Sequence, residues 1–454
     1  MRRNPWTGMV VGLGVAALTL TACGGDSDTG ADSTGDAGGD QGSAAGACDG
    51  VIDGEVTVEA WIHQGQTAEQ EKITDLVERF NSGPGAEQGV TVEIEFIPDA
   101  AYNETVQSAA VAGDLPDALD FDGPNLYNYA WSGNLVPIDS CVPDEVRANL
   151  LPSIVDQGTY NDQLYSVGYY DSGVGIWAWR SVLEENDIRI PEGPDDAWTV
   201  DEFSDALATL TEAGFDSALA SQYYYGGEWY TYGFAPIVQS AGGDLIDRSS
   251  YETADGVLNG PEAVQAMTTW QQWIEDGYVD IEAVDDLPFQ QKEIPLQWVG
   301  HWLYTPNKEA LGDDLVILPL PDFGQGTVSP SGSWNWGITT TAEEPDAVWA
   351  WLEFLLSDEV VVEWSGELGN PPATMSAIEQ LPVFQADGDM GIFIDGLEST
   401  AVPRPQTPAY PAITLAFQEA FANISQGADV QSELDNAASD IDEDLEANQF
   451  YPTQ

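Results

Sequence analysis

The sequence predicts an α/β protein with a parallel sheet, and the first folded stretch of the chain carries this prediction. Residues 56–60 and 90–96 alternate apolar and polar side chains, the pattern of half-buried strands. Between them, residues 73–80 place apolar side chains at helical spacing. A helix over 105–112 and a short strand over 118–121 are expected next. The order strand, helix, strand, helix, strand is typical of parallel strands joined by right-handed crossovers.

Capping residues mark where further helices begin. Thr67 and Gln70 have the spacing of a capping box at the start of the first helix, and Thr199 and Glu202 have it in the middle of the chain. Later elements are expected as helices over 261–276, from Pro345, over 412–425 and over 430–447, and as a strand over 315–320.

The charge of the chain excludes several classes of partner. The 454 residues suggest two or three domains, and they include 78 acidic residues against 11 Lys and Arg, a formal net charge of −67. A surface this acidic repels nucleic-acid phosphates and anionic lipid headgroups, so nucleic-acid binding is excluded. Because salt screens the self-repulsion of such a surface, we interpret the composition as an adaptation to high salt.

The first 22 residues have the features of a signal peptide. Two arginines precede a short apolar run over 10–20, which is followed by Leu-Thr-Ala-Cys. This ending resembles a bacterial lipobox, in which Cys23 becomes the first mature residue and carries lipid. The alternative is an ordinary signal with a chance cysteine. Residues 23–50, rich in Gly and Asp, are expected to form a flexible linker that tethers the protein to the extracytoplasmic face of the membrane.

Motifs for catalysis and metal binding are missing from the sequence. After Cys23 only Cys48 and Cys141 remain, and in an oxidising compartment they are expected to form a disulfide, with two free thiols as the alternative. His63 and His301 are the only histidines, and no metal or cofactor motif is present, so neither a metal nor a cofactor is expected. Glycoside hydrolysis needs a pair of carboxylates. Because the chain has 78 acidic residues, such a pair arises easily by chance, so the count neither supports nor excludes this activity.

Aromatic side chains are the informative feature. Residues 223–234 hold seven aromatics in twelve positions, and further clusters lie at 301–304 and 334–336. Flat rings cover the apolar face of a pyranose, while polar neighbours bond its hydroxyl groups. These clusters therefore favour sugar recognition, although any one of the rings can equally belong to the core.

From about residue 55 to 445 the chain resembles the family 1 extracellular solute-binding proteins of ABC sugar importers. The most specific match is AAVAGDLPDALDFDGPNLYNYAWSGNLVPID at 109–139. The segment at 160–191 and the Trp198–Phe203 helix start also match the family pattern. Two departures are Trp177-Ala178-Trp179, where relatives often carry Tyr-Tyr-Asn, and Gly168 in place of a proline.

The resemblance implies a two-lobed fold of the periplasmic-binding-protein type, with a mixed sheet flanked by helices in each lobe and the ligand in the cleft between them. The expected ranges are 51–168 plus 330–368 for the N-terminal lobe and 169–329 plus 369–454 for the C-terminal lobe. The chain is expected to cross between lobes near 168–172, 328–333 and 366–372.

The implied function is the capture of a neutral mono- or oligosaccharide by hinge closure and its delivery to a membrane permease. The protein is expected to be a monomer with no enzymatic activity. The alternatives are a binder of glycerol 3-phosphate or a peptide, with Arg404 as the anion site, and a surface glycosidase.

The resemblance also places the ligand contacts, on loops at the ends of strands and on the connections between lobes. Asp122 could instead cap a helix, and Arg404 could instead form an ion pair. The expected contacts are Trp61, His63, Gln64, Asp120, Asp122, Asn125, Tyr170, Asp171, Ser172, Trp229, Tyr232, Trp302, Trp334, Asn335, Arg404 and Tyr410.

Overall fold

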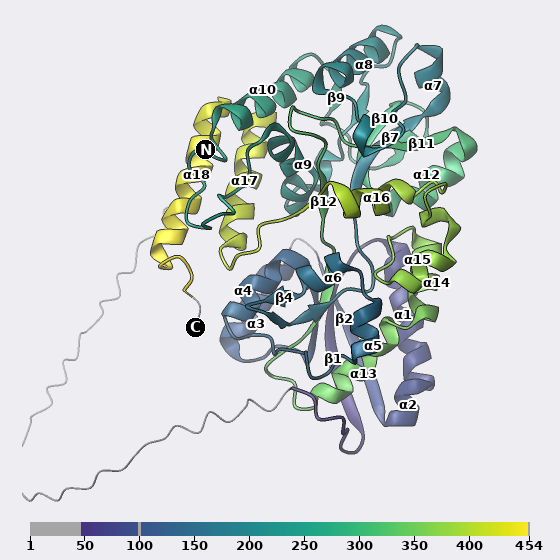
Figure 1. Cartoon of the computed structure of the whole chain (residues 1–454), viewed down its shortest axis with the longest axis vertical. Coiled ribbons are helices and arrows are strands. Elements are labelled where there is room, and N and C mark those ends of the chain that lie inside the picture. The colour runs from purple at the N-terminus through teal and green to yellow at the C-terminus, as the bar shows by residue number, and fades with distance from the viewer. Residues whose placement is uncertain (1–46, 99–100, 453–454) are drawn as a thin grey trace, which may run out of the picture. The chain divides into compact units, whose positions relative to one another are not determined.

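The computed structural model describes residues 47–98 and 101–452. The expected signal peptide, Cys23 and nearly all of the expected linker lie outside the described residues. The folded part contains two five-stranded sheets, each covered by helices (Figure 1). We call the part built on the first sheet the N-terminal lobe and the part built on the second the C-terminal lobe. The α/β prediction and the two-lobed architecture are confirmed.

The N-terminal lobe is built on a mixed sheet with the strand order β2-β1-β3-β13-β6. Strand β1 pairs in parallel with β2 and β3, as the sequence predicts, whereas β13 pairs antiparallel with β3 and β6. The strands are β1 (Val56–His63), β2 (Val90–Ile97), β3 (Ala118–Asp122), β6 (Ser166–Val167) and β13 (Trp334–Ile338). The helices are α1 (Thr67–Ser82), α2 (Pro84–Gln88), α3 (Tyr102–Ala112), α4 (Leu126–Trp131), α5 (Asp144–Asn149), α6 (Pro152–Gln157), α13 (Pro345–Leu355), α14 (Asp358–Leu368) and α15 (Met375–Gln380).

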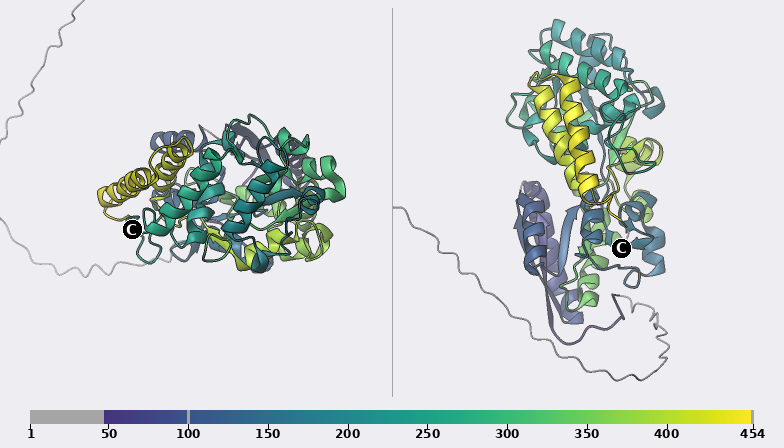
Figure 2. Two further views of the ribbon diagram at one scale, coloured as in Figure 1. Left: turned by 90° about the horizontal axis from the view of Figure 1, so that it is seen from above. Right: turned by 90° about the vertical axis from the view of Figure 1, so that its left-hand side faces the viewer.

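The C-terminal lobe has the strand order β11-β7-β10-β8-β9. Its strands are β7 (Val174–Trp179), β8 (Leu219–Ala220), β9 (Val279–Asp280), β10 (Leu296–Gly300) and β11 (Leu315–Leu318). Its helices are α7 (Arg180–Glu185), α8 (Val200–Glu212), α9 (Glu228–Ala241), α10 (Pro261–Glu275), α11 (Leu287–Gln290), α12 (Tyr304–Leu311), α16 (Gly391–Ser399), α17 (Tyr410–Ser425) and α18 (Val430–Ala447). Helices α17 and α18 lie side by side against this lobe (Figure 2).

Three connections join the lobes. The first runs from β6 to β7 and the second from β11 to β13, close to the expected crossings. The third comes later than the expected 366–372, because Ala373 and Ala377 pack into the core of the N-terminal lobe while Phe384 is the next buried residue in the core of the C-terminal lobe. Strands β12 (Ser329–Ser331) and β14 (Ala401–Pro403) pair in parallel between the lobes.

Local chemistry explains the helix starts. The Thr199 hydroxyl accepts from the backbone N–H of Glu202, whose carboxylate accepts from the N–H of Thr199, so the predicted capping box is confirmed. The capping box predicted at Thr67 and Gln70 is wrong by one residue. Helix α1 begins at Thr67, its N-cap is Gln66, and the N–H of Gln66 donates to Glu69.

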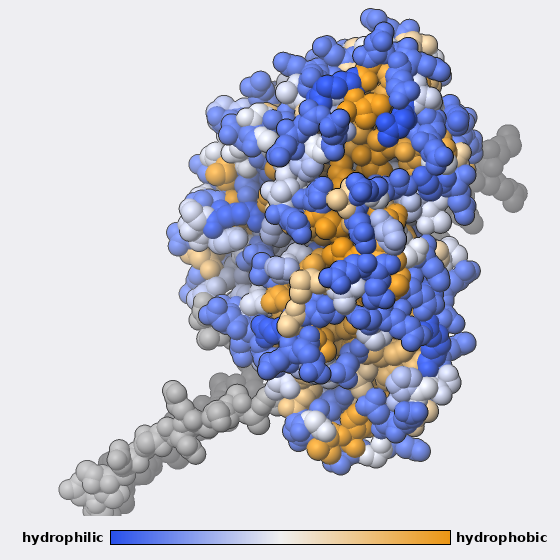
Figure 3. Space-filling view, turned by 45° about the vertical axis from the view of Figure 1, so that its right-hand side comes forward, coloured by the Kyte–Doolittle hydropathy of each residue, from blue (hydrophilic) through white to orange (hydrophobic). Residues whose placement is uncertain are grey.

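A disulfide joins Cys48 and Cys141, as expected, with their Cα atoms 5.0 Å apart. It fastens the start of the described chain to the loop before α5, and the N–H of Cys48 also donates to the hydroxyl of Ser140. Hydrophilic residues cover most of the face shown in Figure 3, and hydrophobic residues are visible in a band that runs down its middle.

Candidate ligand-binding site

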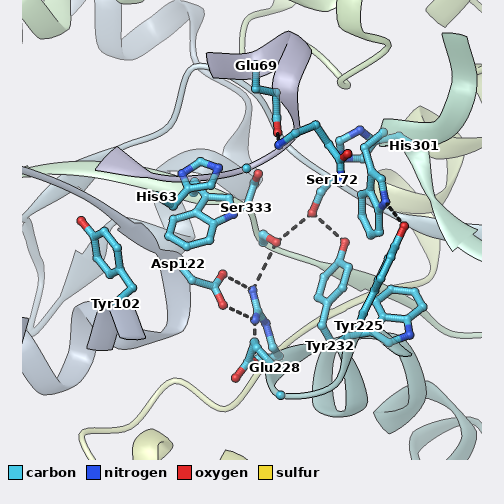
Figure 4. A pocket seen from close by; sticks show the side chains of 18 of the residues that line it. His63, Glu69, Tyr102, Asp122, Ser172, Tyr225, Glu228, Tyr232, His301 and Ser333 are labelled. Atoms are coloured by element: carbon cyan, nitrogen blue, oxygen red, sulfur yellow. Dashed lines mark hydrogen bonds and ion pairs between the residues drawn. The ribbon is translucent and has the colours of Figure 1, made fainter. Parts of the chain in front are cut away.

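A cavity of about 450 Å³ lies between the two lobes (Figure 4). This volume falls within the range of pockets that hold small molecules. The cavity lies at the carboxyl ends of β1 and β3, which end at His63 and Asp122. Open α/β sheets generally bind ligands at the carboxyl ends of their strands. Its lining comes from both lobes and from the connections: His63, Gly65, Gln66, Glu69, Tyr102, Asn103, Asp122, Tyr170, Ser172, Tyr225, Gly226, Gly227, Glu228, Trp229, Tyr232, His301, Trp302, Gly332, Ser333, Trp334 and Arg404.

Aromatic rings form one wall of the cavity in the N-terminal lobe. The His63 and Trp334 rings stack with their centroids 3.7 Å apart and their planes at 11°. Tyr102 meets the edge of Trp334 at 5.7 Å. His63 is fixed from behind, because its Nδ1 lies 2.5 Å from a carboxylate oxygen of the buried Asp120. The wall is therefore held in place before any ligand arrives.

A second aromatic wall comes from the C-terminal lobe. Trp229 and Trp302 meet edge to face at 5.7 Å, and Tyr225 packs against Trp229 at 5.6 Å. The Trp302 indole N–H donates to the Tyr225 hydroxyl, while that of Trp229 donates to the carbonyl of Ser221. Flat rings thus line the cavity from both lobes.

An ion cluster links the two lobes at the floor of the cavity. Arg404 follows β14, and its side chain is only 5% exposed. Its Nη1 and Nη2 donate to the two carboxylate oxygens of Asp122 in the N-terminal lobe, each at 2.5 Å. Nη1 also donates to Glu228 in the C-terminal lobe at 2.7 Å, and Nη2 faces the carbonyl of Gly332 at 3.4 Å.

The pKa shifts in this cluster follow from burial and charge. Burial by itself lowers the pKa of Arg404, but attraction to Asp122 and Glu228 outweighs it, and the pKa lies well above its ordinary value. Burial raises the pKa of Glu228, an effect that Arg404 opposes. The Tyr410 and Thr414 hydroxyls both donate to the Glu228 carboxylate. Glu228 is therefore anchored within its own lobe as well as paired with Arg404.

His301 is a buried, neutral group at the cavity. Its side chain is 3% exposed, and burial lowers its pKa to about 3. Its Nδ1 is buried and has no hydrogen-bond partner among the described residues. The ring packs against Trp302 at 5.4 Å and against Tyr170 at 6.4 Å.

The structure brings nine of the expected contacts to the cavity. These are His63, Asp122, Tyr170, Ser172, Trp229, Tyr232, Trp302, Trp334 and Arg404. Asp122 and Arg404 form an ion pair, which is the role that the sequence analysis gave as the alternative to ligand binding for Arg404. The side chain of Asp122 makes no capping hydrogen bond to the short helix that follows it.

The other seven expected contacts do not line the cavity. Asp120 holds His63, and Asp171 accepts from Ser153, Gln157 and the N–H of Ser172. Tyr410 is fully buried beneath Glu228. The remaining four are Trp61, which packs into the N-terminal core, Gln64, which is exposed, Asn125, which bonds the Asp122 carbonyl, and Asn335, which bonds Gln157 and Ser333.

Sequence reasoning missed several lining residues. Glu69 and Glu228 each lie in the first turn of a helix, α1 or α9, whose N-terminus faces the cavity. Tyr225 belongs to the aromatic cluster at 223–234, which the sequence analysis had singled out as a whole. For Glu69, the sequence signal that could have placed it near the cavity was its capping position at the start of α1. Nothing in the sequence pattern distinguished Tyr102, Asn103 or Ser333.

Comparison with known proteins agrees with this architecture. Residues 75–392 match the model of the family described as bacterial extracellular solute-binding protein. A diacetylchitobiose binding protein of Streptomyces coelicolor is 24% identical over 285 residues, which are 58% of this chain and 56% of that protein, so the match spans little more than half of the relative.

Two solved structures share the fold. The GacH receptor of Streptomyces glaucescens, solved unliganded and with acarbose, has a TM-score of 0.72 at 21% identity, covering 87% of this chain and 98% of that one. An ABC transporter solute-binding protein of Thermotoga lettingae bound with α-D-tagatose has a TM-score of 0.73 at 22% identity, covering 86% and 99%. With more than half of its length matched by the family model, the chain belongs to the bacterial extracellular solute-binding proteins.

Proposed function

We propose that this protein captures an uncharged mono- or oligosaccharide in the cavity between its lobes and delivers it to the permease of an ABC importer. The observation that carries the proposal is the pair of aromatic walls, Trp334 with Tyr102 on one lobe and Trp302 with Trp229 on the other, facing one small cavity. The relatives named above bind diacetylchitobiose, acarbose and tagatose, which supports the sugar class.

The charges around the cavity support an uncharged ligand. Arg404 is the single Lys or Arg that lines it among the described residues, and two carboxylates already hold its guanidinium. The rival binder of glycerol 3-phosphate needs a free cation at this place. An anionic ligand would instead meet Asp122, Glu228 and Glu69.

The geometry gives little support to a glycosidase. Hydrolysis needs one carboxyl group that holds a proton and another that stays ionised. Asp122 and Glu228 are both engaged as ion-pair partners of Arg404, and Glu228 also accepts from the Tyr410 and Thr414 hydroxyls, so the geometry gives both carboxylates a structural role. We therefore propose binding without bond cleavage.

The location follows from the family, whose members act outside the cytoplasm. None of the helices in the described part of the chain is long and apolar enough to span a membrane. We propose that Cys23 carries a lipid anchor after removal of a signal peptide, on the sequence of residues 20–23. Mass spectrometry of the protein from membranes tests this: a lipidated N-terminal Cys23 is expected, and an unmodified mature chain would contradict it.

A ligand panel tests the central proposal. Purified protein is heated with neutral mono- and oligosaccharides, and the sugar is recovered and analysed afterwards. Because a ligand that binds only the native state raises the melting temperature, at least one neutral sugar should do so and be recovered intact. Cleavage of a glycosidic bond would favour the glycosidase, and stabilisation by glycerol 3-phosphate alone would favour the anion binder.

A further inference from the structure

The bond between Asp122 and Arg404 has the geometry of a bound anionic ligand. A guanidinium offers a planar fork that matches the two oxygens of a carboxylate or phosphate. In this protein the fork is filled from within, because Nη1 and Nη2 each donate to one oxygen of Asp122 at 2.5 Å.

Asp122 and Glu228 hold Arg404 in different ways. Glu228 also accepts from Tyr410, Thr414 and Gln418, so its carboxylate is part of the C-terminal lobe. Among the described residues, the carboxylate oxygens of Asp122 bond only to Arg404, and the Asp122 side chain is 14% exposed at the cavity. Asp122 is therefore the partner whose removal opens the fork toward the cavity.

We propose that Asp122 is a specificity-determining residue: it occupies the fork of Arg404 and so restricts the site to ligands without a carboxylate or phosphate. The inference rests on the proposed function and names the chemistry that the site rejects. With Asp122 present, the described part of the chain offers an anionic sugar no unpaired Lys or Arg in the cavity. The sugar instead meets three carboxylates, those of Glu69, Asp122 and Glu228. Without Asp122, a ligand carboxylate can take the vacated place beside Nη2 of Arg404.

The test compares Asp122→Ala with Glu69→Gln. Both remove one carboxylate from the cavity, but Glu69 has no bond to Arg404, so Glu69→Gln controls for the general loss of negative charge. Asp122→Ser is the second variant if Asp122→Ala does not fold, because its single, shorter hydroxyl cannot fill the fork of Arg404. The first probe is sodium formate, used at constant sodium concentration. The second is a comparison of two neutral disaccharides, maltose and cellobiose, with their acidic counterparts, in which glucuronic acid replaces the non-reducing glucose.

The expected result is a gain of anion binding in the Asp122 variants only. Formate should raise the melting temperature of Asp122→Ala by at least 3 °C more than that of the wild type or Glu69→Gln. A uronic acid disaccharide should bind the Asp122 variant at least tenfold more tightly than it binds the wild type. Equal gains in Asp122→Ala and Glu69→Gln, or wild-type binding of the acid as tight as that of its neutral counterpart, would overturn the inference.

The formate experiment separates this inference from the proposed function, because it needs no sugar. If no neutral sugar binds the wild type but formate still stabilises only the Asp122 variants, the proposed function fails and the role of Asp122 stands. If neutral sugars bind and formate acts alike on all variants, the role of Asp122 fails and the proposed function stands.

Discussion

Replacing Arg404 by methionine should destabilise the protein far more than the same change at Arg189. Each arginine pairs with two carboxylates: Arg404 with Asp122 and Glu228, and Arg189 with Asp196 and Glu202. The difference is burial, because the Arg404 side chain is 5% exposed and that of Arg189 is 39% exposed. The pair is therefore a matched comparison of one substitution in two environments.

The expected magnitude follows from the charges left behind. Removing one partner of a buried ion pair costs about 3–5 kcal/mol, because the other charge is left buried and unpaired. The Asp122 side chain is 14% exposed and that of Glu228 is 32% exposed, and Glu228 keeps the Thr414 hydroxyl as a donor. We therefore expect Arg404→Met to lower the free energy of unfolding by about 3 kcal/mol, the lower end of this range. An exposed pair is worth about 0–1 kcal/mol, which is the loss expected for Arg189→Met.

The assay is urea unfolding followed by far-UV circular dichroism at fixed salt, with both variants beside the wild type. Adding Asp122→Asn and Glu228→Gln to Arg404→Met removes the stranded charges and should recover part of the lost free energy of unfolding. A loss of less than about 1 kcal/mol for Arg404→Met, or equal losses for the two arginines, would refute the reasoning from burial.

Four further predictions concern ligand binding and stability. Trp302→Ala should weaken binding of a neutral sugar at least tenfold, about 1.4 kcal/mol, by calorimetric titration, because it removes part of one aromatic wall. The pKa of His301 is about 3 in the fold against 6.5 in a free chain, so the unfolded state binds more protons between these values. As pH falls below 6.5, wild-type unfolding free energy should therefore fall relative to His301→Phe by about 1.4 kcal/mol per pH unit. Replacing Cys48 and Cys141, which lie 93 residues apart, by alanine should lower the free energy of unfolding by about 2–4 kcal/mol, measured by urea unfolding. Molar salt should raise the urea midpoint if the charge of −67 reflects a saline habitat, and equal midpoints at low and high salt would contradict this.

The sequence predicted the sheet of the N-terminal lobe well because its strands and helices carry clean periodic patterns. Strands β1, β2 and β3 and helix α1 lie where alternation and helical spacing placed them. The antiparallel strand β13 was not predicted, because its pairing with β3 joins residues more than 200 positions apart. Long-range pairing of this kind leaves no local pattern.

The candidate site was predictable as a set of loops but not as a set of side chains. Asp120 and Asp122 are two positions apart on β3, yet one lies behind His63 while the other reaches Arg404. Composition cannot separate two aspartates among 78 acids, and only the packing of His63 and Trp334 decides which one faces the cavity. The role of Glu228 was hidden for the same reason.

The most direct test of the central claim is a calorimetric titration of the wild-type protein with the neutral sugar that stabilises it most in the panel. Saturable binding at one site per chain is expected, with the sugar recovered unchanged. If this sugar gives no binding heat at several temperatures, or is recovered in pieces, the proposed capture of an intact neutral sugar is contradicted.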